Sequence, residues 1–199
     1  MSMEKKNDSG KQAGHFDHQQ APVAANQAPE NLVRVNYHTE CEGLVNRQIN
    51  LELYASYAYT AMAHHFDRHD VALKGHHKFF KKMADEEFEH ANKFMEYQNK
   101  RGGTIVLLDI KKPTQQSWNS PLAAHETALQ LEKDVYTALL ELHGYANRHE
   151  DPHLTNYLEE EFLDEQVKSI KEYSDYITNL RRVGPGLGEY IFDKEEFED

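Results

Sequence analysis

The sequence predicts an all-α protein, a four-helix bundle with one long crossover connection. Four long stretches carry apolar residues at intervals of three and four, the spacing of a helix that buries one face. Connections within each successive pair are short, whereas about twenty residues join the two pairs, a known bundle connectivity. No convincing alternation of apolar and polar residues indicates a strand.

The first two helices are expected at about residues 38–66 and 74–100. About seven residues join them, so they should run antiparallel. The buried seam of the first helix reads Val45, Ile49, Glu52, Ser56, Tyr59, Ala63 and Phe66. The seam of the second helix reads Phe80, Met83, Glu87, His90, Phe94 and Tyr97.

The third and fourth helices should start at Ser120-Pro121 and Asp151-Pro152, where a capping side chain precedes a proline at the first helical position. Residues 101–120, if extended, could span more than about 60 Å and return along the bundle. The third seam reads Leu122, His125, Leu129, Glu132, Tyr136, Leu139, His143 and Ala146. The fourth reads Leu158, Phe162, Gln166, Ile170, Tyr173, Ile177 and Leu180, and ends before Gly184-Pro185-Gly186.

The first helix has a second apolar stripe. It consists of Leu44, Leu51, Tyr54, Ala55, Ala58 and Met62. A helix that is apolar on two sides needs a second packing partner. The bundle supplies only one, so we expect the stripe to mediate subunit association.

Composition excludes several classes of protein. The formal net charge of −12 argues against a nucleic-acid partner, although an acidic surface is also ordinary for a soluble protein. Cys41 is the only cysteine, so an intramolecular disulfide is impossible. No apolar run approaches the length of a membrane span, and the first twenty residues lack the apolar core of a secretory signal. We therefore expect a cytoplasmic location.

Two parts of the chain differ in composition. Residues 1–35 are polar and lack apolar periodicity, which predicts a disordered extension in which His15 and His18 are solvated. Residues 36–199 are long enough to bury the core of a single domain.

Each seam carries a polar side chain near its middle. These side chains are Glu52, Glu87 with His90, Glu132 and Gln166. Helices of matched length share their midpoints, so these residues should converge in one layer. Three buried carboxylates cannot all stay ionised without compensation. Protonation, trapped water or a metal ion could each supply it.

The donor types favour iron or manganese over structural zinc, because they are mostly oxygen with one imidazole. Glu87 and His90 form the Glu-x-x-His unit of di-iron bundles. The fourth helix has Gln166-x-x-Ser169 instead of a second unit. One ion would have Glu52, Glu87 and His90 as ligands. A second ion would share Glu87 as a bridging ligand and add only Glu132, so it should bind more loosely than the first. Loose binding suits turnover better than a permanent cofactor.

Several segments resemble eukaryotic ferritin of the heavy, iron-oxidising type. They include RQINLELYASYAY, HFDRHDVALKG, DEEFEHANKF, QNKRGG and LLDIKKP, and the likeness runs from about Val35 to Lys194. The resemblance implies a hollow shell of twenty-four subunits, of one kind or mixed. It also implies that each bundle oxidises ferrous iron with dioxygen at a two-iron site, that ferric mineral is stored inside, and that a short fifth helix follows the bundle.

The same resemblance implies roles for individual residues. The ligands of the first iron match Glu52, Glu87 and His90. The second-iron ligand matches Glu132, the residue beside it Gln166, and a hydrogen-bonding tyrosine Tyr59. Accessory acids that pass iron between the site and the cavity match Glu86 and Glu89. The threefold pore, which pairs an aspartate with a glutamate in the family, here has Asn156 and Glu159, with His143 nearby.

Other histidines and the tryptophan have simpler interpretations. His125, His143 and the group His64, His65 and His69 are expected at the surface or the bundle ends, and Trp118 should anchor the crossover by burial.

Three functions stay open at this point. The first is an iron-oxidising storage protein. The second is a storage or scaffold subunit with an impaired site that co-assembles with active subunits. The third is a di-iron oxygenase or manganese enzyme, which the missing second histidine disfavours.

Overall fold

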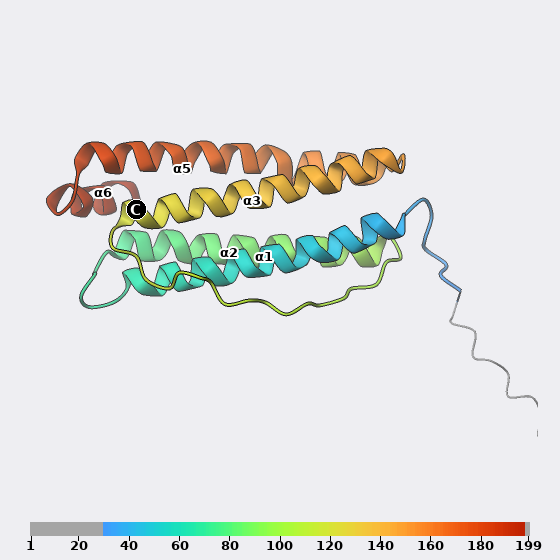
Figure 1. Ribbon diagram of the computed structural model, residues 1–199, viewed down its shortest axis with the longest axis horizontal. Helices are drawn as coiled ribbons and strands as arrows, with labels where there is room; N and C mark the ends of the chain where they lie inside the picture. The colour runs from blue at the N-terminus through green and yellow to red at the C-terminus, as the bar shows by residue number, and fades with distance from the viewer. Residues whose placement is uncertain (1–29, 198–199) are drawn as a thin grey trace, which may run out of the picture. The chain divides into compact units, whose positions relative to one another are not determined.

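The computed structural model describes residues 30–197 and confirms the all-α class (Figure 1). Its helices are α1 (Thr39–Phe66), α2 (Lys74–Lys100), α3 (Pro121–Arg148), α4 (Pro152–Leu158), the π-helical turn η1 (Glu159–Leu163), α5 (Asp164–Val183) and α6 (Leu187–Phe197). The segments α4, η1 and α5 follow one another without a break and together form the fourth long helix. No strand occurs within residues 30–197.

The helices pair as their connections predict. Helix α1 packs on α2, α3 packs on α5, and α1 also contacts α3. The crossover, residues 101–120, runs beside the bundle from the end of α2 to the start of α3 (Figure 1). Trp118 anchors it, because this side chain is buried and its Nε1 donates to Thr127 Oγ1 at 3.2 Å.

The predicted helix starts are confirmed by their caps. Ser120 Oγ accepts from the amide of Ala123 at 3.2 Å, and Asp151 Oδ1 accepts from the amide of Leu154 at 3.0 Å. Each satisfies an amide that the helix itself leaves without a partner. At the other end of the fourth helix, Gly184 adopts φ 70°, a left-handed conformation that glycine tolerates without strain.

The apolar core is divided into two clusters by the polar layer. One cluster includes Tyr59, Phe66, Phe80 and Leu180. The other includes Val45, Ile49, Phe94, Leu139 and Phe162. Along each helix, the predicted polar residues fall between the members of these two clusters. The layer therefore lies at mid-height, as matched helix lengths require.

The second stripe of α1 is only partly open. Ala55, Ala58 and Met62 are buried in the subunit's own core, so the expectation that they await a second partner is wrong. Leu44, Leu51 and Tyr54 are half-buried and line a groove of about 460 Å³. The crossover and α3 form its other walls with Leu108 and Ala138. The prediction of subunit association applies to this groove alone.

Helix α6 caps the start of α2. Helix α2 has no acidic residue in its first turn and no side-chain cap of its own. Asp193 of α6, 1% exposed, accepts from the amides of Gly75 and His76 at 3.1 and 2.7 Å and pairs with His76 Nδ1 at 2.6 Å. Burial raises the pKa of Asp193, but the bonds from His76 and the amides outweigh it and hold this pKa below its usual range. Gly75 permits the contact, because a Cβ there would lie 2.2 Å from Asp193 O.

Two histidines expected at the surface or the bundle ends are buried. His65 lies against Trp118, with ring centroids 5.5 Å apart. His125 is fully buried, and neither of its ring nitrogens has a hydrogen-bond partner. Burial, and then the neighbouring His76, hold the pKa of His125 well below its usual value. Its ring lies against Phe79, Phe80 and Tyr176. Periodicity placed His125 on the seam of α3 but could not identify these partners on other helices.

We expect His125→Leu to stabilise the subunit, most strongly under mildly acidic conditions. The substitution removes buried ring nitrogens without partners, which cost about 1–3 kcal/mol. The folded state keeps His125 neutral, whereas the unfolded chain takes up a proton below about pH 6.5. Stability contributed by the neutral ring is therefore lost as pH falls. Denaturant unfolding at pH 7.5 and 5.5 would test this; a gain no larger at pH 5.5 than at 7.5 would contradict it.

The start of the described segment is hydrogen-bonded to the domain. Asn31 Nδ2 donates to Gly102 O at 2.6 Å, and Arg34 Nη1 pairs with Glu42 Oε2 at 2.5 Å. The rest of the predicted disordered extension, with His15 and His18, lies outside the described residues. None of the described helices combines the length and apolar character that crossing a membrane requires.

Candidate metal centre

The polar layer draws one or two side chains from each long helix. Helix α1 supplies Glu52, α2 supplies Glu87 and His90, α3 supplies Glu132, and α5 supplies Gln166. All of them are buried except His90, whose side chain is 13% exposed. Of the predicted layer, the structure brings Glu52, Glu87 and His90 together in one group and joins Gln166 to Glu132 beside it.

Three of these side chains form a group that could hold a metal ion. Glu52, Glu87 and His90 each offer a ligand atom, and these atoms lie within 4.8 Å of one another. His90 Nδ1 lies 3.2 Å from Glu87 Oε2. Glu52 Oε1 accepts from Gln48 Nε2 at 2.8 Å, while Glu52 Oε2 is buried without a hydrogen-bond partner. An orphaned buried carboxylate oxygen is the acceptor that a cation would satisfy.

The two carboxylates in this group repel each other when both are ionised. Burial, and then the neighbouring Glu87, raise the pKa of Glu52 well above its usual value. Without a cation, one of the two carboxylates would have to carry a proton to relieve their repulsion. A divalent cation would replace that proton and keep both carboxylates ionised. The donor set of two carboxylates and one imidazole suits ferrous iron.

Glu165 contacts His90 and was missed by the sequence reasoning. Its Oε1 lies 3.4 Å from His90 Nε2. Burial lowers the pKa of His90, but the contacts with Glu165 and Glu87 outweigh this effect and raise it to about 10. A π-helical turn adds one residue and shifts the face presented after it. Because η1 lies just before Glu165, regular helical periodicity could not predict which way this carboxylate points. The one feature of the sequence that could have indicated a site role is that Glu165 precedes Gln166.

Glu132 lies beside the three-residue group and is not a member of it. Tyr59 Oη donates to Glu132 Oε1, and Gln166 Nε2 donates to both Glu132 Oε2 and the Glu132 carbonyl oxygen. Burial, and then Glu87, raise the pKa of Glu132 to about 7. Both oxygens of this carboxylate are thus engaged by neighbours. A second ion there would have to displace or share these hydrogen bonds.

Glu86 and Glu89, predicted as accessory acids, line an open pocket next to His90. This pocket, of about 460 Å³, is lined by Lys82, Asp85, Glu86, Phe88, Glu89, His90, Lys93 and Glu165. Glu86 pairs with Lys82 at 3.2 Å. Glu86 and Glu89 therefore lie where cations could move between the buried group and solvent.

The predicted pore residues lie together near the start of the fourth helix. His143 Nε2 contacts Glu159 Oε1 at 2.7 Å, and Asn156 is exposed on α4 one turn before Glu159. The structure thus presents an amide and a carboxylate on one exposed face of this helix.

An all-α bundle with a buried carboxylate layer and a Glu-x-x-His unit defines the class of metal-handling four-helix bundles. Within that class, residues 42–183 match the family model described as the ferritin-like domain. The chain belongs to the ferritin family, and it is of the heavy-chain type.

Its relatives are similar over most of their length. It is 65% identical to soma ferritin of Lymnaea stagnalis over 162 residues, which cover 81% of this chain and 93% of that protein. It is 56% identical to the ferritin middle subunit of Aquarana catesbeiana over 170 residues, covering 84% and 97%. It is 58% identical to ferritin-1 heavy chain of Schistosoma mansoni over 165 residues, covering 83% and 95%.

Proposed function

We propose that this ferritin oxidises ferrous iron with dioxygen inside each bundle and stores the ferric product within a shell of twenty-four subunits. The observation that carries the proposal is the convergence of Glu52, Glu87 and His90 around a carboxylate oxygen that has no other partner. Iron is the substrate here, and up to two ions would bind per subunit. Two ferrous ions would give up one electron each, and dioxygen would take up both electrons with two protons from solvent to leave as hydrogen peroxide.

We assign each of these residues a separate role in binding iron. Glu52, Glu87 and His90 would hold the first iron, and Glu87 with Glu132 would hold the second. Tyr59 and Gln166 keep Glu132 oriented through their hydrogen bonds. Gln166 offers no charge to the second ion, which would therefore be held more weakly and released after oxidation. Glu86 and Glu89 would receive iron in the pocket beside His90.

A second function is a storage or scaffold subunit with impaired oxidation that co-assembles with active subunits. The observation in its favour is that both oxygens of Glu132 are already hydrogen-bonded. The complete set of ligands for the first iron favours the active form. We also propose a cytoplasmic location, which the single buried free thiol of Cys41 fits.

Purified protein mixed with ferrous salt in air tests the proposal. Ferric absorbance should develop much faster than in buffer, and the particles should then retain iron and show the mass of a twenty-four-subunit shell. Oxidation at the buffer rate, with iron retained only after active subunits are added, would identify the scaffold function. Oxidation without retained iron would contradict storage.

The exposed amide of Asn156 predicts slower iron entry than a carboxylate would permit at that position. We expect Asn156→Asp to speed iron uptake, because an added negative charge beside Glu159 raises the local concentration of cations. Stopped-flow uptake at low ionic strength measures the effect, which added salt should reduce. An unchanged rate would refute the proposed role of this face in entry.

A further inference from the structure

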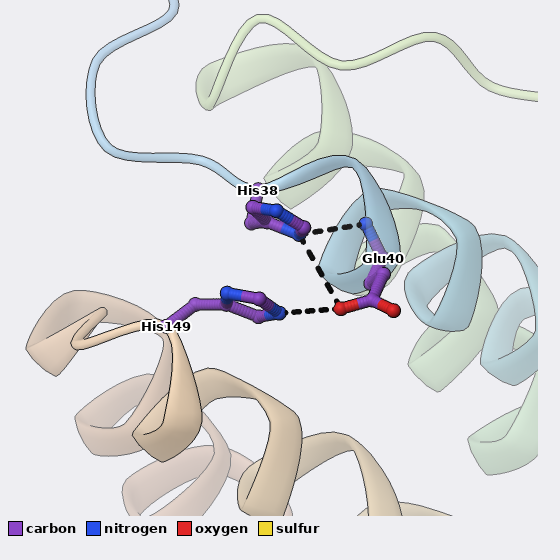
Figure 2. A group of neighbouring side chains, drawn as sticks. All are labelled: His38, Glu40 and His149. Carbon is purple, nitrogen blue, oxygen red and sulfur yellow. Dashed lines mark hydrogen bonds and ion pairs between the residues drawn. The ribbon is translucent and has the colours of Figure 1, made fainter.

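A second group of metal-ligand side chains lies at the junction between the start of α1 and the end of α3. It consists of His38, Glu40 and His149, whose ligand atoms lie within 4.8 Å of one another (Figure 2). Glu40 and Glu52 are twelve residues apart on α1, which separates the two groups by about 18 Å along the helix. The surface group is therefore distinct from the buried one.

Both imidazoles face the same carboxylate oxygen. His149 Nε2 lies 2.6 Å from Glu40 Oε2, and His38 Nδ1 lies 3.7 Å from it (Figure 2). The two rings are stacked, with centroids 3.5 Å apart and an interplanar angle of 9°. Stacking thus aims two ring nitrogens, from residues more than a hundred positions apart, at one anionic oxygen.

The backbone around the group is held in place by long-range contacts. Asn36 Nδ2 donates to Glu150 O at 2.9 Å, which ties the segment before His38 to the segment after His149. Asn36 and Glu150 both have positive φ, 48° and 51°. Such conformations persist in non-glycine residues where the surrounding structure over-determines them. The ligands are therefore presented on a constrained frame.

The group is also open to an incoming ion. The side chains of His38 and Glu40 are 46% and 52% exposed, and that of His149 is 20% exposed. Water can thus complete the coordination. A tetrahedral zinc ion with bonds of about 2.0–2.1 Å needs ligand atoms about 3.3 Å apart. One contact to Glu40 would lengthen from 2.6 Å and the other shorten from 3.7 Å, small shifts for exposed side chains.

We propose that His38, Glu40 and His149 form a surface site for a divalent late transition metal of the zinc type. Two imidazoles and one carboxylate hold zinc in open sites and with free positions also suit ferrous iron, whereas the buried group has more oxygen donors. The Glu40 amide donates to His38 Nδ1 at 3.2 Å, so this nitrogen is the unprotonated nitrogen of the ring, the form that binds a metal. A bound ion would compete with that cap and join the start of α1 to the end of α3.

Zinc binding by the assembled protein tests the site, because zinc is not oxidised. The variants are His149→Gln and His38→Asn, of which the second keeps a side chain that caps α1 well. His69→Gln is the matched control, an exposed histidine outside both groups. All are made in a Glu52→Ala, His90→Ala background, so that zinc in the buried group does not contribute. Equilibrium dialysis with metal analysis gives the zinc bound per subunit, and calorimetry gives the affinity.

We expect each ligand variant to lose one zinc ion per subunit or to bind it at least roughly tenfold more weakly, while the control matches its parent. Circular dichroism and particle mass should be unchanged. If His38→Asn alters the helix content, His149→Gln decides the question, since it changes only a side chain beyond the end of α3. Equal stoichiometry and affinity in His149→Gln and the control would overturn the proposal.

Discussion

Replacing Glu52 and His90 together with alanine is expected to reduce ferrous iron oxidation to the rate seen in buffer, a loss of at least about tenfold relative to the unchanged protein. The double substitution leaves Glu87 as the sole member of the three-residue group. Glu87 and Glu132 would remain, but two carboxylates without Glu52 and the imidazole would hold at most one ion weakly, so paired iron ions could not react there. Stopped-flow absorbance of the ferric product, with protein and iron at fixed ratio, measures the rate.

The variant should fold and assemble, because removing Glu52 also removes a buried carboxylate oxygen without a hydrogen-bond partner. A matched control is Glu96→Ala with His69→Ala, a glutamate and a histidine that are both exposed. That control should oxidise iron at the original rate. Undiminished oxidation by the Glu52, His90 variant would show that the reaction occurs elsewhere.

Replacing Arg101 with alanine is expected to lower the free energy of unfolding by about 3–5 kcal/mol. The guanidinium donates to both carboxylate oxygens of Asp151, at 3.0 and 2.8 Å, and to the carbonyl oxygen of Asn36 at 2.8 Å. Asp151 is 2% exposed. Without Arg101 this carboxylate would remain buried and unpaired, with only the Leu154 amide to stabilise it.

Guanidinium unfolding at equal subunit concentrations measures the loss, since assembly contributes to apparent stability. The control is Arg68→Ala, which breaks an ion pair with Asp70 whose side chains are 51% and 47% exposed. Exposed pairs contribute about 1 kcal/mol or less. Equal losses in the two variants would contradict a special role for the buried pair. Arg101→Lys should be intermediate, because lysine cannot donate in a two-pronged geometry.

Much of the fold was predictable because it depends on contiguous sequence. Helix lengths, the capping residues Ser120 and Asp151, and the seam positions follow from local periodicity and backbone hydrogen bonding. The convergence of Glu52, Glu87 and His90 followed from one further step, since helices of equal length share a midpoint. The position of Glu132 beside that group, and not within it, was harder to predict, because it depends on hydrogen bonds from Tyr59 and Gln166.

Only the tertiary structure decided the contacts between distant segments. Asp193 caps α2 across 117 residues, and His149 meets Glu40 across 109. Glu165 reaches His90 just after a π-helical turn, and His125, in the first turns of α3, is buried against Phe79 of α2 and Tyr176 of α5. Helical periodicity specifies which face of a helix is buried. It does not specify which side chain of another helix lies opposite, because packing and irregular turns set that register.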